Sequence, residues 1–368
     1  MKGLYIHIPF CVRKCEYCDF VSFAGKENCI DRYIDALECE LEGYKGTGVD
    51  TIFIGGGTPS VLNAEQIKRV CGAVYDNFTI EDDAEWSIEV NPGTVEESKI
   101  KAMLSGGINR VSVGVQSFNN KELAAVGRIH NAQTAYDTVM KLSRAGFTNI
   151  SIDLMESLPY QTAESFAYSL KKAVELPIKH ISVYSLIIEE GTPLKDKYDR
   201  GIYSEPDEDT DRDMYAYTAR FLKQYGFERY EISNYAKAGF ESRHNIKYWR
   251  CEEYIGVGLA AHSYCGGKRY SNTSDLYKYM SGDFRSGEEE ELTENDKMSE
   301  FMMLGLRMMC GVNTAEFEKR FGKSFDEVYG KTAARFEKLG LLECCGDFCR
   351  LTEKGIDVSN SVMCEFII

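Results

Sequence analysis

The strongest constraint on the fold is an alternation of short β-rich runs with longer segments of helical apolar spacing, which recurs six times between residues 4 and 187. In the first helical segment, Tyr33, Leu37 and Leu41 share the spacing of one helix face. Strands joined by helices predict a parallel sheet with helical crossovers. Strands are expected at 4–8, 51–54, 86–90, 110–115, 149–154 and 180–187. Helices are expected at 29–44, 64–77, 94–104, 119–126, 132–144 and 163–174.

The length of this alternation also limits the kind of parallel fold. A closed barrel of this type needs about eight units, but the pattern stops after Thr192-Pro193. We therefore predict an α/β fold built as a partial, six-unit, open TIM-like barrel. A doubly wound sheet is the alternative that the pattern alone leaves open. The acidic, turn-like run 205–213 predicts that this first domain, 1–204, ends there.

The remaining chain is predicted to form two further regions. Residues 205–291 are mixed in pattern and rich in Tyr and Gly, which predicts an α+β linker region. Residues 292–368 are expected to hold three helices and then a hairpin with Gly346-Asp347 at its turn. This order is typical of a winged-helix-like domain. Its helices are expected at 296–309, 313–321 and 325–339, and its two β runs at 341–343 and 348–351.

The charge balance excludes several partner classes. The chain has 43 Lys and Arg against 58 Asp and Glu, a formal charge of −15. Such a surface repels nucleic acid and anionic lipid, so we expect no nucleic-acid partner even for the winged-helix-like domain. No apolar run reaches the roughly 18 residues of a membrane helix, and the N-terminus lacks the apolar core of a secretory signal. We expect no stable membrane insertion and a cytoplasmic location.

Three of the 13 cysteines are closely spaced after the first predicted strand. Cys11, Cys15 and Cys18 form a C-x3-C-x2-C pattern, and Asp19 and Phe20 come next, so no fourth thiol follows closely. Structural zinc normally takes four protein ligands. Three thiolates suit a [4Fe-4S] cluster with one iron left open. A thioredoxin-like motif would leave Cys11 unexplained.

Polar groups also follow the other predicted strands. Gly55-Gly56-Gly57-Thr58 comes after the second strand, and the next three strands carry Glu89, Gln116 and Asp153. Because parallel barrels gather their functional groups at the carboxyl ends of the strands, we expect these residues to meet the cysteine loop at one mouth. The glycines allow the backbone to approach an amino-acid-like group closely, and Arg128 can pair with a carboxylate.

On these residues the chain resembles the radical S-adenosylmethionine superfamily. It is most similar to the branch of oxygen-independent coproporphyrinogen III dehydrogenases and their heme-chaperone relatives of the HemW type. The motifs span nearly the whole chain in the order of the family. They are YIHIPFCVRKCEYCDF (5–20), GGGTPS (55–60), EVNP (89–92), GVQSF (114–118), GRIH (127–130), DLMESLP (153–159), EEGTPL (189–194), SRHNIKYW (242–249) and YIGVGLAAHSY (254–264).

The resemblance implies two resident cofactors. Cys11, Cys15 and Cys18 would ligate a [4Fe-4S] cluster, and S-adenosylmethionine would chelate its open iron. One electron from the cluster would cleave the sulfonium and give a 5′-deoxyadenosyl radical, although the sequence leaves productive cleavage open. Matching motif positions place eight residues around S-adenosylmethionine: Tyr5, Gly56, Gly57, Thr58, Glu89, Gln116, Arg128 and Asp153.

Two departures separate the branches. By the resemblance, the dehydrogenase branch carries the pattern C-x3-C-x2-C-x-C. In this chain Phe20 stands at the position of that fourth cysteine, as in the heme-chaperone branch. By the resemblance, the dehydrogenase branch also has longer chains with an extension before the first strand, whereas the first predicted strand here begins at residue 4. Both departures weigh against coproporphyrinogen dehydrogenase activity. Whether the chain is an enzyme at all is left open.

A second motif concerns heme. His244 and Tyr248 stand in a motif that the chaperone branch links to heme binding, and both side-chain types can ligate heme iron. The alternative is a polar helix start with a buried His and Tyr. The resemblance thus predicts a heme chaperone that passes heme to an unidentified acceptor protein. Region 205–291 is predicted to be associated with substrate or heme. A homodimer that depends on the cluster is a further expectation from the family. The alternative function is a coproporphyrinogen III dehydrogenase or another radical tetrapyrrole-modifying enzyme.

Overall fold

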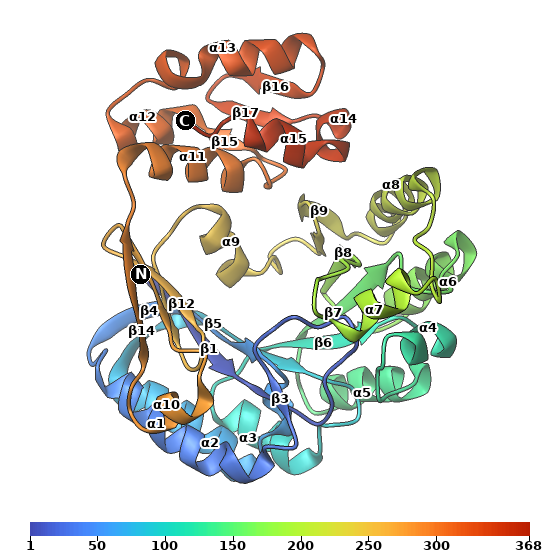
Figure 1. Ribbon diagram of the computed structural model, residues 1–368, viewed down its shortest axis with the longest axis vertical. Coiled ribbons are helices and arrows are strands. Elements are labelled where there is room, and N and C mark those ends of the chain that lie inside the picture. Colours follow the sequence, from blue (N-terminus) through green and yellow to red (C-terminus); the bar gives the residue numbers. More distant parts are fainter.

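The computed structural model describes residues 1–368, with the exception of the Glu288 side chain. Six parallel strands lie side by side in the order β1-β4-β5-β6-β7-β8 (Figure 1). Other strands occupy both edges of this array, so the sheet stays open and does not close into a barrel. The predicted partial, open TIM-like barrel is confirmed. The strands are β1 (Lys2–Ile8), β4 (Thr47–Gly56), β5 (Phe78–Val90), β6 (Arg110–Gln116), β7 (Asn149–Glu156) and β8 (His180–Ser185).

Helices connect these strands and lie together on the outer face of the sheet (Figure 1), unlike a doubly wound fold, which has helices on both faces. The side chains of the sequence set their ends. Asn63 caps the second helix by accepting from the Gln66 backbone N–H at 2.9 Å, and Thr162 caps the sixth in the same way through Ser165. The helices are α1 (Ile30–Glu42), α2 (Ala64–Asn77), α3 (Glu97–Ser105), α4 (Asn120–Ala125), α5 (Ala132–Arg144) and α6 (Ala163–Val174).

The two faces of the parallel strands differ in chemistry. Alternate residues of β6, such as Val111 and Val113, are fully buried in the core, and the residues between them, such as Ser112, line a cavity on the other face. Strand β7 repeats the pattern, with Ile152 in the core and Asp153 lining the cavity. Since successive side chains of a strand point to opposite faces, the polar residues of these strands gather on the inner face.

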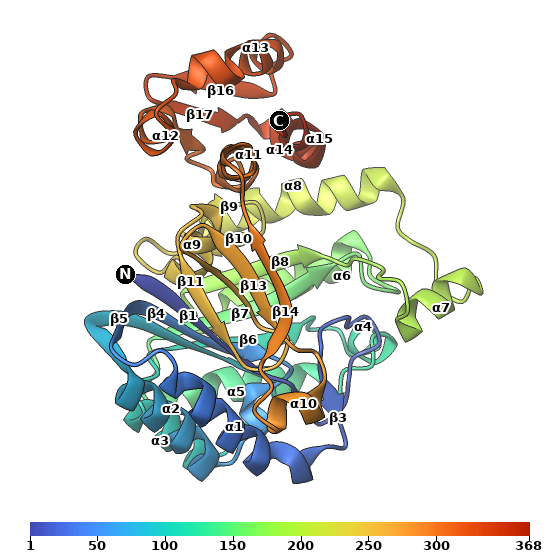
Figure 2. The ribbon, with the colours of Figure 1, turned by 60° about the vertical axis from the view of Figure 1, so that its left-hand side comes forward.

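Residues 205–291 add strands to both edges of the same sheet. β10 (Asn234–Ala236) pairs with β8, and β9 (Glu228–Glu231) pairs with β10 at the end of the sheet. At the other edge, β11 (Tyr254–Val257) pairs parallel with β1. Figure 2 shows the following strands continuing this edge. The proposed division at residues 204 and 291 stays a prediction. The other elements of this region are β12 (His262–Cys265), β13 (Lys268–Asn272), β14 (Arg285–Glu291), α9 (Arg243–Trp249) and α10 (Leu276–Met280).

The acidic run 205–213 is helical over much of its length and is not a turn throughout, which corrects the sequence analysis. Helix α8 (Glu208–Gln224) begins within it, after α7 (Pro193–Asp199). Asp207 caps α8 by accepting from the Thr210 backbone N–H at 3.0 Å. Acidic side chains in the first turn stabilise a helix through its dipole, so the same charges that suggested a boundary favour this helix start.

The C-terminal unit, with α11 to α15, lies at one end of the molecule (Figure 1). It has its own core around Phe317, Tyr329 and Phe366. The three predicted helices and the hairpin are confirmed, and a short strand joins the hairpin in the order β15-β17-β16. Among the described residues, no helix of the chain is long and apolar enough to cross a bilayer. The elements are α11 (Glu294–Gly305), β15 (Val312–Asn313), α12 (Thr314–Phe321), α13 (Phe325–Lys338), β16 (Leu342–Cys345), β17 (Phe348–Leu351), α14 (Glu353–Asp357) and α15 (Ser359–Cys364).

Candidate functional site

A cavity of 480 Å³ opens on the inner face of the parallel sheet. We call it the polar cavity. Every residue that the sequence nominated for a cofactor or for heme lines it, although the role of each residue stays a prediction. These residues are Cys11, Cys15, Cys18, Tyr5, Gly56, Gly57, Thr58, Glu89, Gln116, Arg128, Asp153, His244 and Tyr248. The structure therefore brings together residues separated by more than two hundred positions in the chain.

The cysteine loop forms one wall of the polar cavity. It leaves β2 (Phe10–Cys11) and returns through β3 (Phe23–Ala24), and these two short strands pair with each other. Its three thiols are free. The Thr58 hydroxyl lies 3.4 Å from the Cys11 sulfur as a donor, and burial raises the pKa of the Cys18 thiol. Among the described residues, no three His, Cys, Asp or Glu side chains form a metal site, so the cluster-binding role stays a prediction.

The glycine turn after β4 lies tightly against the start of the cysteine loop. The Gly57 N–H donates to the Ile8 carbonyl at 2.9 Å, and the Thr58 N–H donates to the Phe10 carbonyl at 2.8 Å. A Cβ on Gly57 would lie 2.7 Å from the Phe10 oxygen. Gly56 has a φ of 109°, a conformation that favours glycine. The sequence needs glycine here for both reasons.

Arg128 connects the cysteine loop with the strand ends. Its Nη1 lies 3.3 Å from the Cys15 sulfur, and its Nη2 donates to Asn91 Oδ1 at 2.7 Å and to the Gly114 carbonyl. Asn91 in turn donates to Thr58 Oγ1 at 2.8 Å. The Arg128 Nε is buried and has no hydrogen-bond partner within the described chain. A buried donor of this kind fits an incoming carboxylate.

Two carboxyl groups line the polar cavity, Glu89 on β5 and Asp153 on β7. Glu89 accepts from the Gly56 N–H at 3.1 Å, and Asp153 accepts from the Ser112 hydroxyl at 3.2 Å. Burial and, to a smaller extent, the nearby Asp153 carboxylate together raise the pKa of Glu89 to about 8. Burial raises the pKa of Asp153 too. A ligand that brings a positive charge or hydroxyl donors would favour the ionised carboxylates.

The sequence analysis did not nominate His7 as a site residue, and the structure links it to Tyr5 and to the cysteine loop. The Val21 carbonyl can only accept, so His7 Nε2 donates to it at 2.9 Å, and Nδ1 then accepts from the Tyr5 hydroxyl at 3.0 Å. Burial lowers the pKa of His7, which keeps the ring neutral. The ring also occupies the space beside Gly56 that a Cβ would need. The available signal was that His7 stands two residues after Tyr5, on the same face of a strand.

His244 and Tyr248 lie on one face of α9, as their spacing indicates. His244 is only 1% exposed, and both ring nitrogens have partners: Thr51 Oγ1 at 3.0 Å and the Tyr248 hydroxyl at 2.8 Å. Burial lowers the pKa of His244 to about 3. In this conformation His244 has no free nitrogen for a metal, and the heme contact predicted for this pair stays a prediction.

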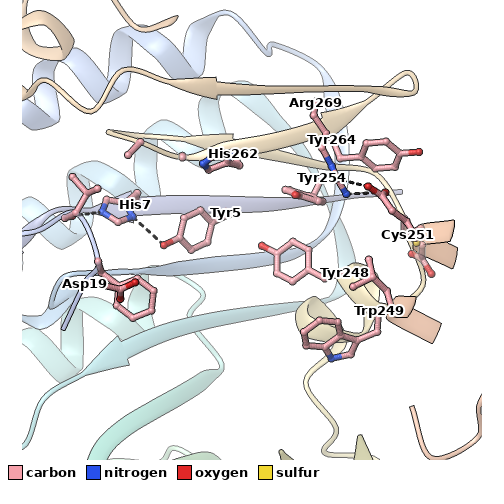
Figure 3. Close-up of a pocket in the computed structure, with 17 residues that line it drawn as sticks. Tyr5, His7, Asp19, Tyr248, Trp249, Cys251, Tyr254, His262, Tyr264 and Arg269 are labelled. Atoms are coloured by element: carbon pink, nitrogen blue, oxygen red, sulfur yellow. Dashed lines mark hydrogen bonds and ion pairs between the residues drawn. The ribbon is translucent and has the colours of Figure 1, made fainter. Parts of the chain in front are cut away.

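A second cavity, of 520 Å³ (Figure 3), shares part of its lining with the first. We call it the aromatic cavity. Tyr5, Phe20 and Tyr248 line both cavities. The other lining residues of the aromatic cavity lie on β1, β11, β12, β13, α9 and α11, in the cysteine loop and in the turns before β11 and β12. Phe20, which replaces the fourth cysteine of the dehydrogenase pattern, is 64% exposed and stands at this boundary. The other residues that line the aromatic cavity include His7, Asp19, Trp249, Tyr254, His262, Tyr264 and Arg269.

Comparisons with known proteins match this arrangement. The model of the radical SAM superfamily matches residues 5–173, and that of the HemN C-terminal domain matches residues 292–358. The whole chain is 39% identical to the "Heme chaperone HemW" of Lactococcus lactis subsp. lactis (strain IL1403), of which it covers 97%. The chain belongs to the HemW family. The predicted resemblance is thereby confirmed.

Two further comparisons place this HemW-family chain. It is 35% identical over its full length to the "Heme chaperone HemW" of Bacillus subtilis (strain 168), of which it covers 99%. The coproporphyrinogen III oxidase (HemN) of Escherichia coli, described as a radical SAM enzyme, is similar in structure, with a TM-score of 0.86 at 26% identity. The similarity covers 99% of this chain and 89% of that one. Both branches named by the sequence analysis thus share the fold.

Proposed function

We propose that this HemW-family chain is a heme chaperone, which binds heme and transfers it to an acceptor protein. Full-length similarity to proteins named heme chaperones carries the proposal. The aromatic cavity supports it, because an aromatic-lined cavity of several hundred Å³ suits a flat apolar ligand. The cavity adjoins the cysteine loop at Phe20.

The residues of the polar cavity fit the two cofactors implied by the family. Cys11, Cys15 and Cys18 would hold a [4Fe-4S] cluster as free thiolates with donors close to two of them. When bound together, the cluster and S-adenosylmethionine supply one-electron reductive chemistry at a sulfonium centre. The remaining predicted residues would hold S-adenosylmethionine. They are Tyr5, Gly56, Gly57, Thr58, Glu89, Gln116, Arg128 and Asp153.

Each part of this chain would have a separate task toward those cofactors. The Arg128–Asn91–Thr58 chain of hydrogen bonds orients the cysteine loop against the strand ends. The glycine turn lets a ligand reach the backbone. Glu89 accepts a hydrogen bond from that turn and keeps a carboxyl oxygen inside the polar cavity. Preorganised groups of this kind bind a ligand without rearranging.

The finer parts of the proposal concern partners. The acceptor would be a heme protein lacking its heme, and transfer would take place in the cytoplasm. A homodimer remains part of the proposal. The negative charge of the chain makes nucleic acid a poor partner.

A second candidate function is the coproporphyrinogen III dehydrogenase reaction, or another radical modification of a tetrapyrrole. The polar cavity is complete in the residues predicted for S-adenosylmethionine, and the fold matches an oxidase of this class. Phe20 in place of a fourth cysteine argues against it. The anaerobically reconstituted protein, given coproporphyrinogen III and a reductant, should make no protoporphyrinogen. Catalytic turnover would reverse the order of the two candidates.

Heme transfer is the direct test of the chaperone proposal. The reconstituted chain is loaded with heme, separated from excess and mixed with an apo-heme protein whose activity reports heme uptake. We expect activity to appear at a rate that rises with the concentration of the acceptor, as direct transfer requires. The same heme on serum albumin is the matched control. Recovery that is independent of acceptor concentration and no faster than release from albumin would contradict the proposal.

A further inference from the structure

The five histidines of the chain fall into two classes. His7, His130, His180 and His244 are buried, and each has at least one ring nitrogen in a hydrogen bond. His262 is exposed, and no hydrogen bond joins either of its ring nitrogens to another described residue. Nδ1 of His130 also has no partner within the described chain, but it is buried and lies outside the aromatic cavity. His262 is therefore the exposed histidine whose lone pair is available without breaking a native contact.

This imidazole lies in the aromatic cavity. His262 begins β12 and lines the cavity on the side of Tyr5, while Tyr248 lines it from α9 (Figure 3). The Tyr248 and Tyr254 rings meet edge to face with their centroids 4.6 Å apart. Aromatic walls around a single unpaired nitrogen base are a suitable environment for a flat macrocycle that carries a metal at its centre.

The buried carboxylate of Glu40 holds the backbone that leads to His262 in place. Glu40 accepts from the Gly258 N–H at 2.8 Å and from the Asn272 side chain at 2.7 Å, and Tyr279 donates to the same carboxylate at 2.7 Å. Glu40 is 5% exposed, so this network is sheltered from water. Residues held by several buried hydrogen bonds lose little entropy when a ligand binds. The turn that leads to His262 is thus preorganised.

The charges in the aromatic cavity fix the orientation of such a ligand. Asp19, Glu252 and Glu300 line it together with one guanidinium, that of Arg269. Arg269 is already paired with Glu300, at 2.8 Å between Nη2 and Oε2. No lining cation is left unpaired among the described residues. The acidic side chains would repel carboxylate groups of a ligand. A macrocycle would therefore enter with its apolar edge first and keep its propionate groups outside the cavity.

We propose that the aromatic cavity is the heme site and that a ring nitrogen of His262 is the axial ligand of the heme iron. The step proposed is coordination: the imidazole lone pair binds the iron. This inference rests on the proposed function, since it assumes that the chain carries heme. It assigns the iron to His262, whereas the motif containing His244 supplies Tyr248 to the cavity wall.

The test compares heme titrations of the cluster-reconstituted full chain, followed by the Soret band under anaerobic conditions. The wild type should saturate near one heme per chain. His262→Ala should weaken binding by about tenfold or more and shift the Soret maximum, and added imidazole should restore the wild-type spectrum. His262→Gln, which keeps most of the volume, should lose the same band. Unchanged S-adenosylmethionine binding in both variants checks their fold.

Ser271→Ala is the matched control, because Ser271 pairs with His262 in register on β13 and hydrogen-bonds Ser286. It should bind heme like the wild type. If the wild type saturates and His262→Ala gives the same affinity and the same Soret band, the His262 assignment is overturned and the chaperone proposal stands. If the wild type itself binds no heme in a saturable way, the chaperone proposal fails and the assignment fails with it.

Discussion

The two adjoining cavities are built in opposite ways. In the polar cavity, most functional side chains already have partners: Arg128 contacts Cys15, Asn91 and Gly114, and His244 has both nitrogens occupied. In the aromatic cavity, His262 has no partner for its ring within the described part of the chain, and aromatic rings form much of the wall. Under the proposed function, the first cavity would hold resident cofactors in a fixed arrangement. The second cavity would offer one histidine that is free to bind a metal, within mainly aromatic walls. Such a site suits a cargo that must later be released.

The difference has a structural origin. The polar cavity lies at the carboxyl ends of parallel strands, where every strand of the barrel can contribute a group. The aromatic cavity lies at the edge where β11 and β12 extend the barrel past β1, next to α9 and α11. A shared wall of Tyr5, Phe20 and Tyr248 separates the two. Changes in one cavity should therefore leave ligand binding in the other largely intact, and this independence can be tested.

The largest effect should follow from Cys15→Ala. Removing one of three thiolates should cost nearly all of the cluster, measured as iron and sulfide content and as absorbance near 400 nm. Cys39→Ala, at an exposed thiol of α1, is the matched control and should keep the full cluster. Heme should still saturate the Cys15 variant. A full iron load in Cys15→Ala would remove this residue from the cluster site, and lost heme binding would break the independence of the cavities.

Glu89→Gln should come next. The amide keeps the shape but loses the charge, and hydrogen bonds to charged groups are worth roughly 1.5–3 kcal/mol. We expect S-adenosylmethionine to bind about 10- to 100-fold more weakly by calorimetry, with heme affinity unchanged. Glu97→Gln, on the exposed side of α3, serves as the control. Equal S-adenosylmethionine affinity in the two variants would place Glu89 outside the site.

The pKa of Glu89 predicts a smaller, pH-dependent effect. With a pKa of about 8, this carboxyl group is mostly protonated at neutral pH in the ligand-free protein. A cationic ligand favours the ionised form, so binding releases a proton. S-adenosylmethionine affinity should then rise by up to about tenfold per pH unit below pH 8 and level off above it. Glu89→Gln should flatten this part of the profile. A wild-type affinity that falls between pH 6.5 and 8 would contradict the assignment.

The smallest effect is expected from Thr51→Val. The change keeps the volume and removes the hydroxyl that His244 contacts at 3.0 Å. It should lower the free energy of unfolding by about 1 kcal/mol, measured by denaturant titration of the chain without cofactors. Heme affinity should stay within about twofold of the wild type, since His244 acts here as a positioning residue for Tyr248. Heme loss comparable to that of His262→Ala would instead make His244 the ligand.

Much of this could be predicted from the chain alone. Helices α2 and α6 have the bounds that the periodicity predicts, because their caps at Asn63 and Thr162 are local signals. The residues nominated for the polar cavity converge because strand order fixes where strand ends meet. The pairing of β11 with β1 could not be predicted, since it joins positions about 250 apart and depends on packing. The sequence also could not predict that the His262 ring has no hydrogen-bond partner among the described residues, because local sequence does not show which ring nitrogens form hydrogen bonds.

The most direct test of the two-cavity arrangement is simultaneous occupancy. S-adenosylmethionine is titrated by calorimetry into the reconstituted chain, first without heme and then with heme at saturation. We predict one S-adenosylmethionine per chain in both cases, with affinities within about threefold of each other, because the two ligands occupy different cavities. Displacement of one ligand by the other, with a falling apparent affinity as the competitor rises, would show that heme and S-adenosylmethionine share one site and would contradict the separation of cofactor and cargo.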